Sequence, residues 1–143
     1  MKIIEADILT VQSGFILHQA NCRGKHGAGL ARALSSKWPD RFIVYRDFCK
    51  SFGERGAGCS ILAGKDPSIV HVLGQVEIGK ATDYSLVEKA ISDFNRQRQY
   101  RFSHLPVAIP HLMGCGIGGG DWSIYSEILE FYLPDATVYR LTL

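Results

Sequence analysis

Two glycine-rich segments carry the residues whose types and spacing are best suited to chemistry. The first, HQANCRGKHGAGLARAL at residues 18–34, places three glycines within six residues between an apolar run and a helix-like stretch. Backbone N–H groups at the start of a helix, where the helix dipole is positive, favour anions. One glycine would suffice for a strand-to-helix turn. Three glycines with Lys25 and His26 between them therefore predict an anion site, with phosphate as the first candidate.

The second segment, GCGIGGGDW at residues 114–122, has five glycines in seven residues. A plain turn does not need so many, because each glycine costs about 1 kcal/mol of conformational entropy relative to alanine in a regular element. The absence of Cβ atoms lets backbone N–H groups approach the oxygens of a pyrophosphate. Neither segment matches the dinucleotide fingerprint GxGxxG or the P-loop GxxxxGK[ST]. We expect the two segments to hold one extended phosphate ligand from opposite sides.

Three polar residues near these segments each have two interpretations. Asp121 is suited to cap the N-terminus of the following helix, and it is also suited to orient a water molecule in the cleft; the two roles can coexist. Asn21 fits a turn or a contact to a ribose hydroxyl. Asp7, which follows the first strand-like run, fits a turn or cap, or an acceptor for a purine amino group.

The histidines and cysteines have different expected roles. His26 is flanked by Lys25 and a glycine, and we expect it to face whatever the first segment binds. His18 and His71 lie within apolar runs and are predicted to be hydrogen-bonded core histidines. The four cysteines are irregularly spaced and include no CxxC pair, so the sequence predicts neither a zinc site nor a disulfide framework.

Strand-like and helix-like runs alternate along the chain and must position these residues. The expected strands are residues 1–6, 14–20, 59–63, 69–76, 105–109 and 137–141, and the expected helices are residues 30–38, which Pro39 ends, 42–52, a helix capped by Asp83, and 122–132. This order predicts an α/β fold, a three-layer α/β/α sandwich with a mixed, largely parallel central sheet. Ligands of such sheets bind beyond the carboxyl ends of the strands, where both glycine-rich segments begin.

Composition limits the classes of protein that remain. The 143 residues fit one domain, residues 1–143, and 46% hydrophobic with 21% charged residues is typical of a globular chain. A net charge of +2 argues against a general nucleic-acid binder. No apolar run approaches the roughly 20 residues of a membrane span, and the first residues do not resemble a signal peptide. We expect a monomer in the cytoplasm.

Four motifs, in order along the chain, resemble those of macrodomains, the ADP-ribose-binding modules. They are ADILT, HQANCRGKHGAGLARAL, IPHLMGCGIGGGDW and VYRL. The sequence NCRGKHGAGLA resembles the corresponding motif of the branch that contains the terminal ADP-ribose protein glycohydrolase and the yeast-type ADP-ribose-1″-phosphate phosphatase. The resemblance covers nearly the whole chain. It implies that the chain binds ADP-ribose or a derivative, free or attached to protein, and needs no cofactor.

The resemblance also implies roles for individual residues. Asp7 would accept from the adenine amino group beside the Ile8 backbone, and Leu141 would lie against the adenine ring. The expected ligand-binding residues are Asp7, Ile8, Asn21, Lys25, Gly27, Ala28, Gly29, Gly116, Ile117, Gly118, Gly119, Gly120 and Leu141; the expected catalytic residues are Asp121, His26 and Asn21; no metal ligand is expected.

One part of the resemblance fails. The glycohydrolase relatives have a nucleophilic lysine where this chain has Gln75, and Lys80 comes several residues later. Their aspartate would align nearer Gly118 than Asp121. Three functions follow as alternatives: a hydrolase of ADP-ribose-1″-phosphate or of an ADP-ribosyl linkage that uses water, a non-catalytic reader of free or protein-linked ADP-ribose, and a more general binder of nucleotides or phosphate esters.

Overall fold

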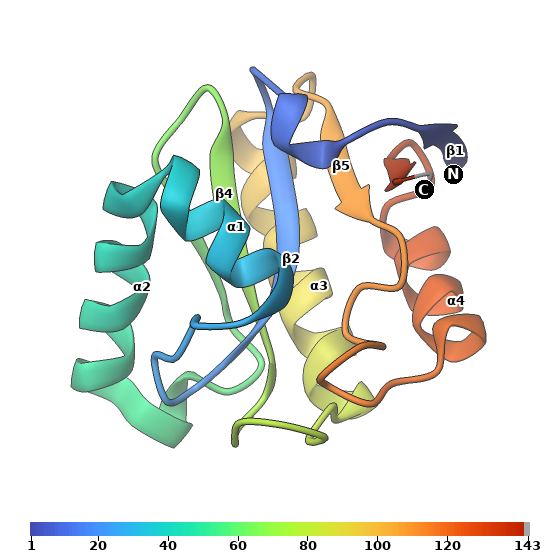
Figure 1. Cartoon of the computed structure of the whole chain (residues 1–143). Helices are drawn as coiled ribbons and strands as arrows, with labels where there is room; N and C mark the ends of the chain where they lie inside the picture. Colours follow the sequence, from blue (N-terminus) through green and yellow to red (C-terminus); the bar gives the residue numbers. More distant parts are fainter. Residues whose placement is uncertain (142–143) are drawn as a thin grey trace.

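The computed structural model describes residues 1–141 and contains one mixed sheet with helices on both sides (Figure 1). The strands are β1 (Lys2–Glu5), β2 (Phe15–Asn21), β3 (Ser60–Ala63), β4 (Ser68–Gln75), β5 (Val107–Pro110) and β6 (Thr137–Arg140), and the helices are α1 (Gly29–Lys37), α2 (Pro39–Phe52), α3 (Tyr84–Arg101) and α4 (Trp122–Tyr132). The strand order is β1-β6-β5-β2-β4-β3. Every neighbouring pair is parallel except β3 and β4, which are antiparallel.

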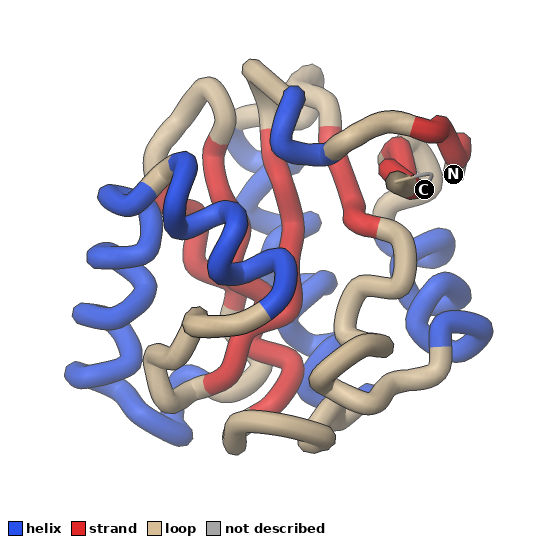
Figure 2. The backbone as a smooth tube through the Cα atoms, viewed as in Figure 1, coloured by secondary structure: helices blue, strands red, loops and turns tan. Residues whose placement is uncertain are grey.

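Two hydrophobic clusters hold the layers together, one on each face of the sheet. Helices α3 and α4 pack on one face around Phe94, Tyr125 and Leu129, which are fully buried. Helices α1 and α2 pack on the other face with Leu34 and Phe42. Figure 2 shows the strands enclosed between helices in this way. The predicted α/β/α sandwich with a largely parallel sheet is therefore confirmed.

The structure corrects the sequence prediction at the first helical region. Pro39 was expected only to end a helix, but it is the first residue of α2, which follows α1 after the single residue Trp38. Proline lacks the N–H that a first helical residue does not use, and its fixed φ suits that position. Two short 3₁₀ helices, Ile8–Thr10 and Gly53–Gly56, were not predicted either.

The parallel arrangement brings five chain segments to one edge of the sheet. Strand β2 ends at Asn21, within the first glycine-rich segment, and β5 ends at Pro110, shortly before the second. Strand β4 ends at Gln75 and is followed by the loop that leads to α3. Strands β1 and β6 end at the same edge, followed by Asp7 and Leu141. Within residues 1–141, no helix is long and apolar enough to cross a membrane.

Candidate functional site

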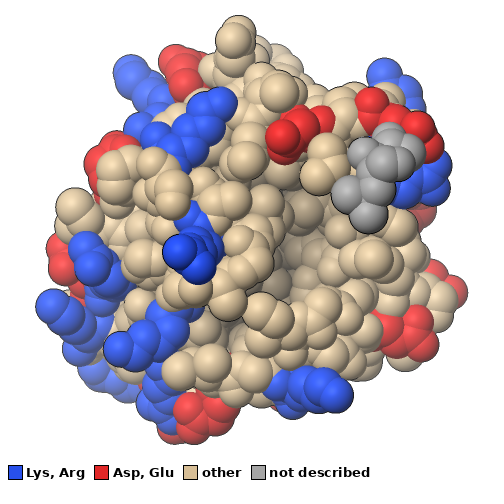
Figure 3. Space-filling view, in the orientation of Figure 1, with Lys and Arg blue, Asp and Glu red and all other residues tan. Residues whose placement is uncertain are grey.

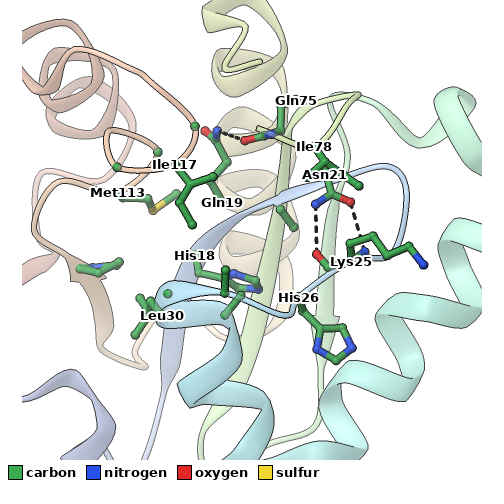
Figure 4. A pocket seen from close by; sticks show the side chains of 18 of the residues that line it. His18, Gln19, Asn21, Lys25, His26, Leu30, Gln75, Ile78, Met113 and Ile117 are labelled. Carbon is green, nitrogen blue, oxygen red and sulfur yellow. Dashed lines mark hydrogen bonds between the residues drawn. The ribbon is translucent and has the colours of Figure 1, made fainter. Parts of the chain in front are cut away.

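A cleft of about 520 Å³ opens at the carboxyl edge of the sheet, between the two glycine-rich segments. Its lining comes from the end of β2 and the first segment (His18, Gln19, Ala20, Asn21, Lys25, His26, Gly27, Ala28, Gly29, Leu30, Ala31), from the end of β4 and the loop after it (Gln75, Ile78, Gly79), from the end of β5 and the turn after it (Pro110, His111, Leu112, Met113), and from the second segment (Gly114, Gly116, Ile117, Gly118). Figure 3 shows the hollow in the surface, and Figure 4 shows labelled residues of both segments around it. The prediction that the two segments share a cleft is confirmed.

Unpaired backbone donors occur on both sides of this cleft. Among the described residues, the N–H groups of Gly27 and Ala28 donate no hydrogen bond, and neither do those of residues 116–118. No side chain caps the N-terminus of α1. The two segments approach each other closely at Gly29, because a Cβ on that glycine would lie 3.8 Å from Cδ1 of Ile117. Two opposed sets of N–H groups are suited to bind the oxygens of an anion with more than one phosphate.

Asn21 organises the first glycine-rich segment from within. Its Oδ1 accepts from the backbone N–H groups of Arg23 at 3.0 Å and Lys25 at 3.2 Å and from the Tyr45 hydroxyl at 3.0 Å. Its Nδ2 donates to the Lys25 carbonyl at 3.0 Å, as Figure 4 shows. The predicted turn role of Asn21 is thus present in the structure. One amide hydrogen of this side chain remains for a ligand.

His26 lines the cleft, and its ring packs against two aromatic side chains of α2. Its ring centroid is 4.9 Å from that of Phe42 and 6.4 Å from that of Tyr45. Partial burial, and then the positive charges of Arg46 and Lys25, lower the pKa of His26. At neutral pH the imidazole is therefore largely neutral, the form that can accept a proton.

A partly buried polar network lies at the floor of the cleft. Gln19 donates through Nε2 to Oε1 of Gln75 and to Oγ1 of Thr82, both at 2.7 Å, and its Oε1 accepts from the Tyr125 hydroxyl at 2.7 Å. Thr82 in turn donates to the Gly114 carbonyl at 3.0 Å. These bonds connect β2, β4, the loop before α3 and α4 to the second glycine-rich segment, and they fix its first residue relative to the sheet.

The side-chain amide of Gln75, which the sequence resemblance places near a lysine of the glycohydrolases, has hydrogen-bond partners for both its nitrogen and its oxygen. Its Nε2 donates to the carbonyls of Glu77 at 2.6 Å and Gly79 at 3.1 Å, while Oε1 accepts from Gln19. Lys80 is exposed and lies against Gly119, where a Cβ would meet its Cγ at 3.0 Å. Among the described residues the one lysine that lines the cleft is Lys25.

The end of the second segment turns away from the cleft. Gly119 donates to the Gly116 carbonyl at 3.1 Å and Gly120 to the Gly114 carbonyl at 2.9 Å, so their N–H groups are used within the segment, and neither residue lines the cleft. Asp121 caps α4, accepting from the N–H and hydroxyl of Ser123. The predicted capping role of Asp121 is confirmed, whereas its carboxylate is not among the cleft-lining groups.

The residues expected at an adenine ring are not among those that line the cleft. Asp7 caps the first 3₁₀ helix by accepting from the Leu9 N–H at 2.9 Å, and Ile8 is buried in the core. Leu141 follows β6 and is 64% exposed. Strands β1 and β6 are paired, and the Ala6 N–H donates to the Arg140 carbonyl at 3.1 Å, so Asp7 and Leu141 follow neighbouring strands at the same edge. Their contact with a base stays a prediction.

The charges around the cleft are mainly positive. Figure 3 shows lysine and arginine side chains over α1 and α2, beside the hollow. These helices contribute five basic residues, Arg32, Lys37, Arg41, Arg46 and Lys50, and two acidic ones, Asp40 and Asp47. No aspartate or glutamate of residues 1–141 lines the cleft, and that part of the chain has no group of three or more His, Cys, Asp or Glu side chains suited to hold a metal ion. Such a field attracts anionic ligands.

His18, which lines the cleft, and His71 form a buried hydrogen-bonded pair; the sequence predicted hydrogen-bonded core histidines at both positions but not their pairing. Nε2 of His71 donates to the Arg41 carbonyl at 3.1 Å, because a carbonyl can only accept. Nδ1 of His71 is then the acceptor for Nε2 of His18 at 2.7 Å. Burial, followed by the charge of His26, lowers the pKa of His18 to about 4, and burial with the charge of His18 puts the pKa of His71 well below its ordinary value.

We expect the protein to lose stability as the pH falls from 7 to 5. The unfolded chain protonates its histidines near pH 6.5, whereas the folded chain keeps His18 and His71 neutral, so the unfolded state binds more protons. Each of the two histidines then lowers the free energy of unfolding by up to about 1.4 kcal/mol per pH unit below pH 6.5. Urea unfolding at several pH values measures this slope. His18→Gln should reduce it and the exposed His104→Gln should not; a stability independent of pH over this range would contradict the account.

Several residues of the site were not singled out from the sequence. Gln19 was quoted only as part of a motif, although a glutamine inside an otherwise apolar strand signals a buried hydrogen-bond network. Thr82 and Tyr125 gave no such signal, because only the fold brings them to Gln19. Ile78 and Leu112, at the rim of the cleft, are exposed apolar residues of loops and could not be recognised before the cleft was known.

Sequence comparisons find curated proteins that match part or most of this chain. No protein-family model matches the chain. An ADP-ribose 1″-phosphate phosphatase of Neosartorya fischeri is 37% identical over 49 residues, which are 34% of this chain and 24% of that protein. The polyprotein P1234 of Venezuelan equine encephalitis virus is 28% identical over 135 residues, 92% of this chain and 5% of the polyprotein. This chain therefore spans a minor part of the curated relatives it matches.

Solved structures match over nearly the whole chain. A protein of unknown function from Bacteroides thetaiotaomicron is 25% identical, with a TM-score of 0.86 and coverage of 98% of this chain and 97% of that one. The macrodomain of Mycobacterium tuberculosis DarG is 21% identical, with a TM-score of 0.81 over 99% and 97% of the two chains. Thermosipho africanus DarTG, solved in complex with ADP-ribose, is also 21% identical, with a TM-score of 0.81 over 99% of this chain and 41% of that one. The resemblance found in the sequence motifs is confirmed, and the chain has the macrodomain fold.

Proposed function

We propose that this chain binds ADP-ribose and hydrolyses an ADP-ribose derivative, with ADP-ribose-1″-phosphate as the substrate we favour. The observation that carries the proposal is the pair of opposed, unpaired N–H sets at the cleft, residues 27–28 on one side and 116–118 on the other. A pyrophosphate offers oxygens to both sets at once. The similarity to an ADP-ribose 1″-phosphate phosphatase over 49 residues and the ADP-ribose complex of a structural neighbour support this choice.

The proposed orientation follows the order of the strands. The adenosine half lies toward Asp7 and Leu141, which follow β1 and β6, and the distal ribose lies toward the first glycine-rich segment, which follows β2. The substituent of the distal ribose is then near Lys25 and His26. Lys25 neutralises charge that develops on a phosphate, and the remaining amide hydrogen of Asn21 binds a hydroxyl of the ribose.

The proposed reaction is attack of water on the terminal phosphate, which releases ADP-ribose and inorganic phosphate. The neutral imidazole of His26 is suited to accept the proton of that water. A covalent adduct at Gln75 is not part of the proposal, because an amide is not a nucleophile for an opened ribose. Asp121 orienting the water remains a prediction, and its position at the start of α4 supports the capping role instead. We place this activity in a cytoplasmic monomer, with ADP-ribosylated protein as an alternative substrate.

The second candidate function is a reader that binds ADP-ribose without turnover. It is favoured by one observation: no carboxylate of the described residues lines the cleft. Incubation of the purified protein with ADP-ribose-1″-phosphate, followed by chromatography, distinguishes the two. The hydrolase predicts slow release of phosphate with no adduct trapped by borohydride. A substrate that binds but survives long incubation with stoichiometric protein would establish the reader.

A further inference from the structure

Arg23, in the first glycine-rich segment, forms an ion pair with the loop that follows β4. Its Nε donates to Oε1 of Glu77 at 2.6 Å, and its Nη2 donates to Oε2 of the same carboxylate at 2.7 Å. Nη2 also donates to Oε1 of Glu54 at 2.9 Å, in the 3₁₀ helix that follows α2. Two parallel hydrogen bonds of this kind fix both the distance and the orientation of the paired side chains. Arg23 also holds the pKa of Glu77 below its ordinary value, so the pair stays charged at neutral pH.

Both ends of the Arg23–Glu77 pair are tied to residues that line the cleft. The backbone N–H of Arg23 donates to Oδ1 of Asn21 at 3.0 Å, and the carbonyl of Glu77 accepts from Nε2 of Gln75 at 2.6 Å. Asn21 and Gln75 are register partners at the ends of β2 and β4, and both line the cleft. A displacement of either member of the pair therefore reaches the cleft wall.

The pair joins two loops that have few other bonds between them. The N–H of Cys22 donates to the carbonyl of Val76 at 3.0 Å. Beyond that bond, no backbone hydrogen bond of the described chain joins residues 23–28 to residues 77–82. Lys25 and Ile78, which line the cleft, lie on these two loops. The side-chain hydrogen bonds that span the loops are those of the Arg23–Glu77 pair.

The effect of this pair is local to the two loops. The side chains are 35% exposed at Arg23, 65% at Glu54 and 60% at Glu77, and exposed ion pairs add little to the stability of a fold. Bidentate geometry within a network of charges is the case in which such a pair has a measurable effect. None of the three side chains lines the cleft, so they have no direct contact with a ligand there.

We propose that Arg23 and Glu77 are positioning residues, whose ion pair holds the first glycine-rich segment and the loop after β4 at the spacing that the distal ribose requires. The proposal rests on the proposed function, since it takes the ligand to be ADP-ribose with its distal ribose at the first segment. With the pair intact, the two walls are ordered before the ligand arrives. Without it, binding must order them, and this lowers the affinity.

The test measures ADP-ribose affinity by calorimetry for Arg23→Gln, Glu77→Gln and the double variant. We expect each single variant to weaken binding about tenfold, because the walls are no longer held at their spacing. The double variant should lose no more than either single variant, because both substitutions break the same pair. Glu77→Gln removes a negative charge beside a site for an anion, so an effect of charge alone predicts tighter binding, whereas positioning predicts weaker binding.

Two further variants separate positioning from a general loss of charge or fold. Arg23→Lys keeps the charge but not the paired hydrogen bonds, and its affinity should lie between those of the wild type and Arg23→Gln. Arg96→Gln, which breaks the exposed ion pair with Asp93 on α3 outside the cleft lining, is the control and should bind like the wild type. The melting temperatures of all variants should stay close to that of the wild type.

The contrary results are distinct from one another. Wild-type affinity in Arg23→Gln would overturn the proposal, and tighter binding by Glu77→Gln would show that the pair acts through its charge. Additive losses in the double variant would show that the two residues do not act as a pair. A large fall in melting temperature would reduce their role to folding. If the wild-type protein does not bind ADP-ribose, the proposed function itself fails, and the proposal for the pair fails with it.

Discussion

Gly116→Val is expected to weaken ADP-ribose binding by at least about a hundredfold while leaving the stability of the protein unchanged. A Cβ at Gly116 would meet no other atom within 4 Å, and its φ lies outside the left-handed region, so the unliganded fold accepts a side chain there. The same open space is the cleft, next to the unpaired N–H groups of residues 116–118. A side chain displaces the phosphate from its donors, and a hundredfold loss corresponds to about 2.7 kcal/mol.

Matched variants make this result interpretable. Gly27→Val tests the opposite side of the cleft, where a Cβ also meets nothing within 4 Å, and it should have a similar effect. Ser51→Val is the control, because it adds a valine at an exposed position of α2 that lies outside the cleft lining. Calorimetry gives the affinities and thermal denaturation the stability. Normal binding by both valine variants would contradict the pyrophosphate site.

Gln19→Leu is expected to lower the free energy of unfolding by about 3–5 kcal/mol. The substitution leaves the Tyr125 hydroxyl, Oε1 of Gln75 and Oγ1 of Thr82 each without the Gln19 partner, in a partly buried region. Each unsatisfied buried group costs about 1–3 kcal/mol. Because Thr82 holds the Gly114 carbonyl, the second glycine-rich segment should also loosen, with weaker ligand binding. Urea denaturation measures the first effect and calorimetry the second.

Tyr125→Phe is the matched variant for this network. It removes one hydroxyl and leaves the Gln19–Gln75 and Gln19–Thr82 bonds in place, so its cost should be about 1–2 kcal/mol. Equal stability of Gln19→Leu and the wild type would show that water, and not the fold, satisfies these groups. The network would then have no part in positioning the second segment.

The alternation of strands and helices was sufficient to predict the sandwich and the edge where the cleft lies. Both glycine-rich segments follow parallel strands, and that constraint alone brings them together. The error at Pro39 arose because a proline ends one helix and begins another equally well, and sequence spacing does not distinguish the two.

The sequence could not predict which glycines of the second segment line the cleft and which are needed for the fold of the segment. Gly116 and Gly118 line the cleft, whereas Gly119 and Gly120 donate within the segment, and the difference depends on two hydrogen bonds inside that segment. A Cβ at Gly118 would lie 2.7 Å from Oγ1 of Thr82, so that glycine is also required by packing. Composition shows that such a segment is glycine-rich but not which glycine serves the ligand and which serves the fold.

The most direct test of the central claim is a calorimetric comparison of ADP-ribose with AMP on the wild-type protein. Opposed N–H groups from both glycine-rich segments need a ligand with two phosphates and the distal ribose. The account predicts ADP-ribose binding in the micromolar range, about −8 kcal/mol, and much weaker binding of AMP. Equal affinities for the two ligands, or no binding of ADP-ribose, would contradict the two-segment pyrophosphate site.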